Sequence, residues 1–120
     1  MKPYQDARVE GEKLAKQYAE LEKADQVDFY NGLEGYYSVL GHNKKQEAIA
    51  VLIEKNDHKI YVYQLDKGIS QDKAATISRE KGASDIDKIT FGRYQDKPIW
   101  EVKSGKQYYL VDFETGAVIQ

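Results

Sequence analysis

The chain has 120 residues, of which 41% are apolar and 32% charged, and its net charge is −2. This length allows one ordinary domain or two very small ones. Neither half is basic, so the charge pattern argues against a nucleic-acid partner or an anionic membrane surface. The chain has no cysteine, which excludes disulfides, thiolate zinc sites and thiol nucleophiles. No apolar run approaches the roughly 20 residues that span a bilayer, so no membrane segment is predicted.

A helix is predicted from Tyr4 to about Asp25. Its apolar positions recur in steps of three and four: Tyr4, Ala7, Gly11, Leu14, Tyr18 and Leu21. The same spacing also fits a coiled-coil seam, but a glycine there costs about 1 kcal/mol relative to alanine. We therefore favour a helix lying on a sheet, with Gly11 marking a close approach of two backbones.

Three strands are predicted next. Residues 27–32 are read as a connecting segment that ends in the Asn31-Gly32 turn. The strands follow at residues 36–40, 47–54 and 59–65, with residues 41–45 as the first hairpin loop.

The second half shows the same order of elements. Ser70 is a good N-cap for a helix over residues 71–81, and Gly82 is the expected stop. Strands are predicted at residues 86–94, 99–103 and 107–113, with a short terminal strand at 117–119.

The two halves resemble each other when shifted by about 48 residues, which aligns Tyr61 with Tyr109 and Gly68 with Gly116. The sequence therefore predicts an α+β protein of two tandem units, residues 1–68 and 69–120, each with one helix on an antiparallel sheet. The expected core of the second unit is Trp100, Val102, Tyr109, Val111 and Phe113. The expected core of the first unit is Leu14, Tyr18, Val51, Ile53, Val62 and Leu65, with Tyr61 and Tyr63 as the alternative inward set on the last strand.

No residue set predicts catalysis, a metal site or a cofactor site. His42 and His58 fall in predicted polar turns, without a carboxylate motif nearby. The serines form no nucleophile elbow, and the glycines form no phosphate-binding loop. The acidic pair at Asp85 and Asp87 lacks the further oxygen ligands of a calcium loop. Asp112, before Thr115-Gly116, is interpreted as a carboxylate that accepts turn N–H groups.

Tyrosines are the candidate binding residues, because the chain has ten of them. Tyr36, Tyr37, Tyr108 and Tyr109 form two adjacent pairs on predicted strands. Neighbours on a strand point to opposite faces, so one ring of each pair should lie on the outer face. Such rings either bind a protein partner or cover the neighbouring unit.

The second unit resembles the PepSY domain. The matching residues are 69–77 at the start of the helix, Pro98-Ile99-Trp100-Glu101-Val102-Lys103, residues 108–112 and residues 115–118. The first unit, through residues 34–41 and 47–51, is similar to the leading domain of YpmB-like proteins of Gram-positive bacteria.

This resemblance implies a cystatin-like fold in each unit and an envelope protein that faces outward. YpmB-like proteins are held in the cell membrane by an N-terminal helix that this chain does not contain, so a membrane is expected only through such an anchor. The expected function is a non-catalytic binding module for a protein partner, with an extracellular peptidase or a wall-processing protein as the class implied. The alternative is a structural or self-associating ectodomain with no link to peptidases.

Overall fold

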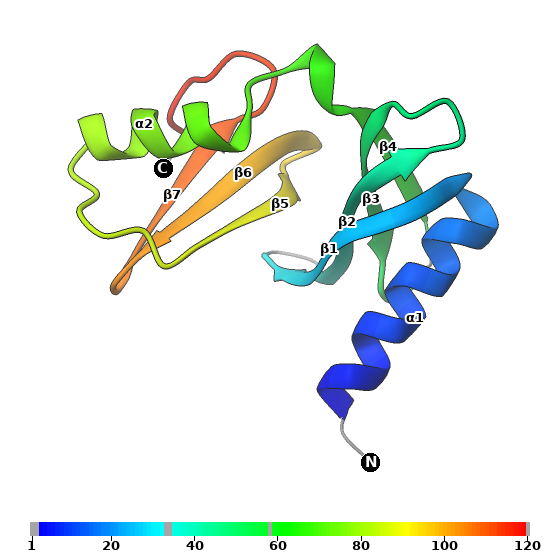
Figure 1. Ribbon diagram of the computed structural model, residues 1–120. Coiled ribbons are helices and arrows are strands. Elements are labelled where there is room, and N and C mark those ends of the chain that lie inside the picture. Colours follow the sequence, from blue (N-terminus) through cyan, green and yellow to red (C-terminus); the bar gives the residue numbers. More distant parts are fainter. Residues whose placement is uncertain (1–2, 33–34, 58, 120) are drawn as a thin grey trace. The chain divides into compact units, whose positions relative to one another are not determined.

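The chain divides into two compact units, Met1–Gln64 and Leu65–Gln120. A computed structural model describes residues 3–32, 35–57 and 59–119, and Figure 1 shows the elements of both units. The division falls four residues before the boundary expected from the sequence, because a short 3₁₀ turn, Leu65–Lys67, belongs to the second unit.

The first unit begins with helix α1 (Pro3–Tyr18) and strand β1 (Leu21–Asn31). The prediction of one helix as far as Asp25 is wrong. Glu20 adopts a positive φ of 57°, which turns the chain out of the helix. Leu21 then enters the core as the first residue of β1. Leu21 therefore continues the predicted helical spacing of apolar residues only by coincidence.

The first sheet has four strands where the sequence predicted three. Its order is β1-β2-β3-β4, all antiparallel, with β2 at Gly35–Asn43, β3 at Ala48–Glu54 and β4 at Ile60–Gln64. The predicted hairpin loop therefore begins too early, because β2 continues through Asn43.

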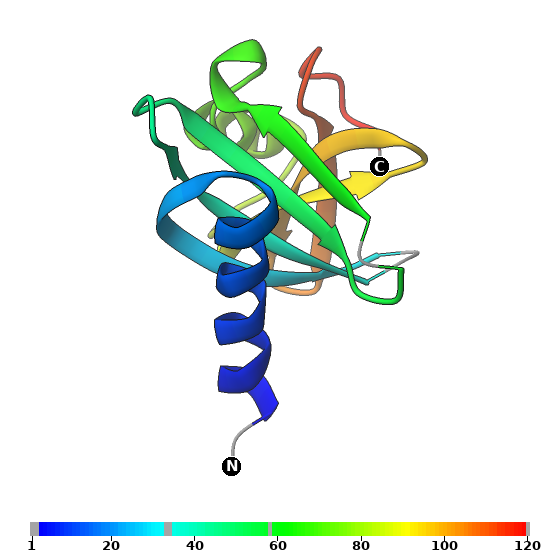
Figure 2. The same ribbon diagram turned by 90° about the vertical axis from the view of Figure 1, so that its right-hand side faces the viewer.

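Helix α1 packs on one face of this sheet, against β1, β2 and β3. Figure 2 shows its first turns extending past the end of the sheet. The core beneath the helix is made of Ala15, Ala19, Leu21, Val27, Tyr37, Val39, Ile49, Val51 and Ile53. A Cβ atom on Gly11 would lie 3.1 Å from the Cβ of Tyr37, so α1 does approach β2 closely at Gly11, but against a side chain and not through the predicted contact of two backbones.

The predicted core of the first unit is correct only in part. Val51 and Ile53 are fully buried, and Leu14 is partly buried. Tyr18 is 61% exposed and Val62 is 48% exposed, so both were wrongly assigned to the core. Val62 lies on β4, beyond the strands against which α1 mainly packs. Leu65 is half-buried and belongs to the second unit.

The second unit contains helix α2 (Gln71–Glu80) and three strands, β5 (Lys88–Tyr94), β6 (Lys97–Ser104) and β7 (Gln107–Asp112). The strands form one antiparallel sheet in the order β5-β6-β7, and α2 packs on β6 and β7. The predicted helix signals are confirmed. The Ser70 side chain accepts a hydrogen bond from the Lys73 N–H at 3.0 Å, and Gly82 adopts a φ of +116°.

Aromatic rings form the core of the second unit. The Phe91 ring makes edge contacts with Trp100 at 5.0 Å and Phe113 at 5.2 Å between centroids. The Trp100 indole N–H donates to the carbonyl of Ile69 at 3.0 Å. Burial of Trp100, Val102, Val111 and Phe113 confirms the predicted core, while Tyr109 is only half-buried.

The α+β class and the antiparallel pairing are thus as expected. The two units differ, however, in having four strands and three, and β1 has no counterpart in the second unit. The terminal strand predicted at residues 117–119 is reduced to a single bridge between Val111 and Val118. A cystatin-like tandem origin stays a prediction.

Candidate partner-binding surface

Tyr36 and Tyr37 point to opposite faces of the first sheet, as neighbours on a strand must. Tyr37 lies under α1 beside Gly11, and burial raises its pKa, with a smaller contribution from the charge of Glu10. Tyr36 lies on the other face, near the rings of Tyr30 and Tyr61 at 6.3 and 6.4 Å.

Both rings of this pair are buried. Tyr36 is 4% exposed and Tyr37 is 6% exposed, and their role in binding a partner stays a prediction. The sequence carries a signal for this burial. Residues 36–41 are all buried, and only Ser38 interrupts their apolar run.

In the second pair, Tyr108 and Tyr109, one ring was expected to be exposed, and Tyr108 is that ring. It is 52% exposed and lies opposite Lys103 on β6. Tyr109 lies opposite the buried Val102, on the face covered by α2, and is half-buried. Among the four candidate tyrosines, Tyr108 alone offers a largely open ring.

The surroundings of Tyr108 combine an aromatic ring with positive charge. The register places Lys88, Lys103 and Tyr108 in one row across β5, β6 and β7. Two rows along, on the same face of the sheet, burial raises the pKa of Glu101, and the nearby Lys88 partly opposes that shift. Cationic and aromatic side chains in adjacent positions suit contact with another protein.

Strand β4 is a second candidate surface. It is an edge strand of the first sheet, and none of its five residues is buried. Val62 is its most exposed apolar side chain. An edge strand carries main-chain N–H and C=O groups that no neighbouring strand uses.

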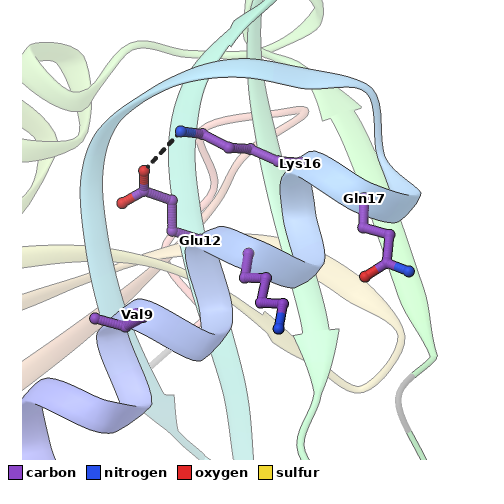
Figure 3. A pocket seen from close by; sticks show the side chains of 5 residues that line it. Val9, Glu12, Lys16 and Gln17 are labelled. Atoms are coloured by element: carbon purple, nitrogen blue, oxygen red, sulfur yellow. Dashed lines mark ion pairs between the residues drawn. The ribbon is translucent and has the colours of Figure 1, made fainter.

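A shallow, open depression runs along the outer side of α1 (Figure 3). Val9, Glu12, Lys13, Lys16 and Gln17 line it. The Lys16 ammonium lies 2.9 Å from the Glu12 carboxylate, an exposed pair one helical turn apart. Val9 is 67% exposed, so this face offers one apolar contact among solvated charges.

Among the described residues, the histidine and acidic side chains form no metal centre. In the part of the chain that the structure describes, no group of three or more histidine and acidic side chains is placed to hold a metal ion. His42 does have a carboxylate partner, contrary to expectation: it lies in β2, with its Nδ1 2.9 Å from Oδ2 of Asp25 in β1. His58 lies outside the described residues.

The carboxylates of Asp87 and Asp112 accept hydrogen bonds from backbone N–H groups. Asp87 accepts the N–H of Gly105 at 2.8 Å. The Oδ1 atom of Asp112 accepts the N–H groups of Glu114 and Thr115 at 2.8 and 3.1 Å, which confirms the structural interpretation of this turn. Among the described helices, neither has the length and apolarity needed to cross a membrane.

Comparison with known proteins gives consistent matches. Residues 10–54 match the family described as "Cell wall elongation regulator TseB-like domain". A Bacillus subtilis (strain 168) protein described as "Probable cell wall elongation regulator TseB" is 37% identical over 114 residues, covering 88% of this chain and 70% of that protein.

A solved structure extends the likeness to both units. The YpmB protein from Bacillus subtilis is 32% identical, with a TM-score of 0.77 over 100% of this chain and 96% of that one. The resemblance to YpmB-like proteins is thereby confirmed, while the PepSY identity of the second unit stays a prediction. The chain belongs to the TseB-like family.

Proposed function

We propose that this protein regulates cell wall elongation from outside the membrane, by binding a protein partner without catalysing a reaction. The observation that carries the proposal is the 37% identity over 114 residues to a protein described as a cell wall elongation regulator. The wall is built outside the cell membrane, so a protein that binds wall-processing partners directly would meet them there.

The surface chemistry supports binding over catalysis. The exposed groups that stand out are the Tyr108 ring with its lysine row and the open edge of β4. Both provide contact area or main-chain hydrogen bonds, the means by which proteins recognise other proteins. The resemblance to PepSY domains makes a wall-processing peptidase the partner class to test first.

The test uses a strain deleted for this gene. We expect a slower or misplaced incorporation of a labelled wall precursor along the cell, restored by the wild-type protein exported behind a membrane anchor. A purified wall-processing peptidase from the same envelope should change its rate of cleaving wall fragments when the protein is added. Normal incorporation in the deletion strain would refute the regulatory role, and an unchanged peptidase would refute only the peptidase partner.

Self-association is the second candidate function, and exposure on α1 favours it. Val9 and Tyr18 are both exposed on this helix. Val9→Asp should abolish a concentration-dependent dimer in sedimentation experiments if α1 is the dimer surface. Leu14 is a poor position for this test because it packs against the core. A monomer at all concentrations would reject this candidate.

A further inference from the structure

The outer edge of β4 is built to receive another strand. We propose that it binds an extended peptide segment of a partner protein, which joins the first sheet beside β4. The proposal deepens the proposed function, because it names the surface and the kind of ligand through which a regulator would act. The proposal rests on the main-chain geometry of β4 as well as on the exposure of its side chains.

The register shows which main-chain groups point outward. The N–H of Glu54 donates to the carbonyl of Lys59 at 2.8 Å, so these two residues are a hydrogen-bonded pair. In an antiparallel ladder such pairs alternate with pairs that share no hydrogen bonds. Tyr61 and Tyr63 are therefore bonded to β3, opposite Leu52 and Ala50. The N–H groups of residues 60, 62 and 64 and the C=O groups of residues 60 and 62 point away from β3.

The side chain of Val62, next to this edge, is exposed as well. Val62 lies opposite Val51, which belongs to the core beneath α1, so Val62 points to the helix-covered face. It is nevertheless 48% exposed, because α1 packs mainly on the other strands. An incoming strand would place an apolar side chain against Val62 while its main chain bonds to the free groups.

The other edge strands are blocked in different ways. Strand β1 has register irregularities at Leu21/Lys23 and Ala24/Gln26, and such bulges disrupt pairing with a further strand. The outer side of β7 is already used, since Ile119 N–H donates to the Leu110 carbonyl at 2.7 Å. The centre of β5, residues 90–92, is buried. Among the edge strands that the structure describes, β4 is the one without such protection.

The geometry selects an extended peptide as the ligand. A row of outward N–H and C=O groups is matched by the same row on another strand, and strand addition is a recurrent mode of peptide recognition. A second copy of this chain is a poorer occupant. Stable dimers bury roughly 1,200–2,000 Å², far more than two five-residue strands provide. The expected ligand alternates apolar and polar residues, with a branched or aromatic side chain opposite Val62.

The test selects short peptides from a displayed random library against the whole protein. We expect enriched peptides with this alternation. Each synthesised peptide should slow hydrogen exchange at the N–H groups of residues 60, 62 and 64, which exchange quickly in the free protein. Absence of enrichment, slow exchange of these N–H groups before peptide is added, or protection at a different site would overturn the proposal.

Val62→Pro is the decisive variant. Proline removes an N–H that makes no bond to β3 and blocks the approach of another strand, so folding should survive. The affinity for the peptide should fall about tenfold or more, because one hydrogen bond is lost and the proline ring blocks the edge. Val62→Thr keeps the N–H and the branched shape and is the matched control, with affinity within about threefold. Equal binding by wild type and Val62→Pro would overturn the proposal.

The remaining outcomes separate this proposal from neighbouring ones. A concentration-dependent dimer that Val62→Pro abolishes would replace the peptide with a second copy of the chain. If Val62→Pro loses peptide binding but restores wall-precursor incorporation in the deletion strain, the edge is not the regulatory surface and the proposed function stands. If Val62→Pro does not fold, the exchange measurements on wild type still decide the matter.

Discussion

Replacing Trp100 by phenylalanine tests the account of the second core. The indole N–H donates to the Ile69 carbonyl at 3.0 Å, and the ring packs against Phe91 and Phe113. Phenylalanine keeps an aromatic ring at this position but cannot donate the hydrogen bond. It also leaves a gap where the larger ring was, because well-packed cores collapse only in part.

The expected loss of stability follows from these two changes. Losing the hydrogen bond costs about 1–2 kcal/mol, and the gap costs about 1–2 kcal/mol. A unit the size of Leu65–Gln120 has a total stability of about 3–8 kcal/mol. Trp100→Phe should therefore remove about 2–4 kcal/mol, a large share of that total.

Urea unfolding followed by circular dichroism measures this loss. Fluorescence cannot serve for the variant, because Trp100 is the chain's single tryptophan. Tyr108→Phe is the control, since an exposed ring on the same sheet should change stability by less than about 0.5 kcal/mol. A loss below about 1 kcal/mol for Trp100→Phe, or equal losses for both variants, would refute the reasoning.

Three further predictions concern the second unit. Asp112→Ala should destabilise it by about 2–3 kcal/mol in urea, because two turn N–H groups lose their acceptor, and Asp112→Asn should cost less because an oxygen remains. Equal effects would contradict this. Ser70→Ala should cost about 1 kcal/mol in thermal unfolding by removing the helix cap, and no change would show that the cap is dispensable. Burial raises the pKa of Glu101, so the folded state holds its proton more tightly and stability falls as pH rises from the usual glutamate pKa to the raised one. Glu101→Gln should flatten that fall, and an unchanged pH profile would show that Glu101 does not cause it.

The second unit was predictable because its signals are local. Ser70 and Gly82 mark the ends of α2 through their own side chain and backbone, without help from distant residues. The alternation of Trp100 and Val102 identifies the buried face of β6. These features are encoded within a few residues of each other, so the sequence reveals them.

The first unit was less predictable because tertiary pairing overrides its local pattern. Strand β1 has charged residues directly after Leu21, at Glu22 and Lys23, and contains two register irregularities, which together hide its alternation. The burial of both Tyr36 and Tyr37 was not expected, for a related reason. The alternation rule assumes one solvated face, whereas both of these rings are buried. The apolar run that contains them, interrupted only by Ser38, was the better guide.

The open edge of β4 depends on which strands pair, and the sequence does not state this. The residue types at positions 59–65 favour a β-strand as strongly as those of a central strand would, so they do not mark the segment as an edge. Only the strand order β1-β2-β3-β4 makes β4 an edge strand. Only the register shows that the main chain of Tyr61 and Tyr63 hydrogen-bonds to β3. The main-chain groups of β4 therefore have two roles, depending on whether they face β3 or solvent. The inward main-chain groups hold β4 in the sheet, while those of Val62 point outward, so a change at Val62 tests binding with little effect on the fold.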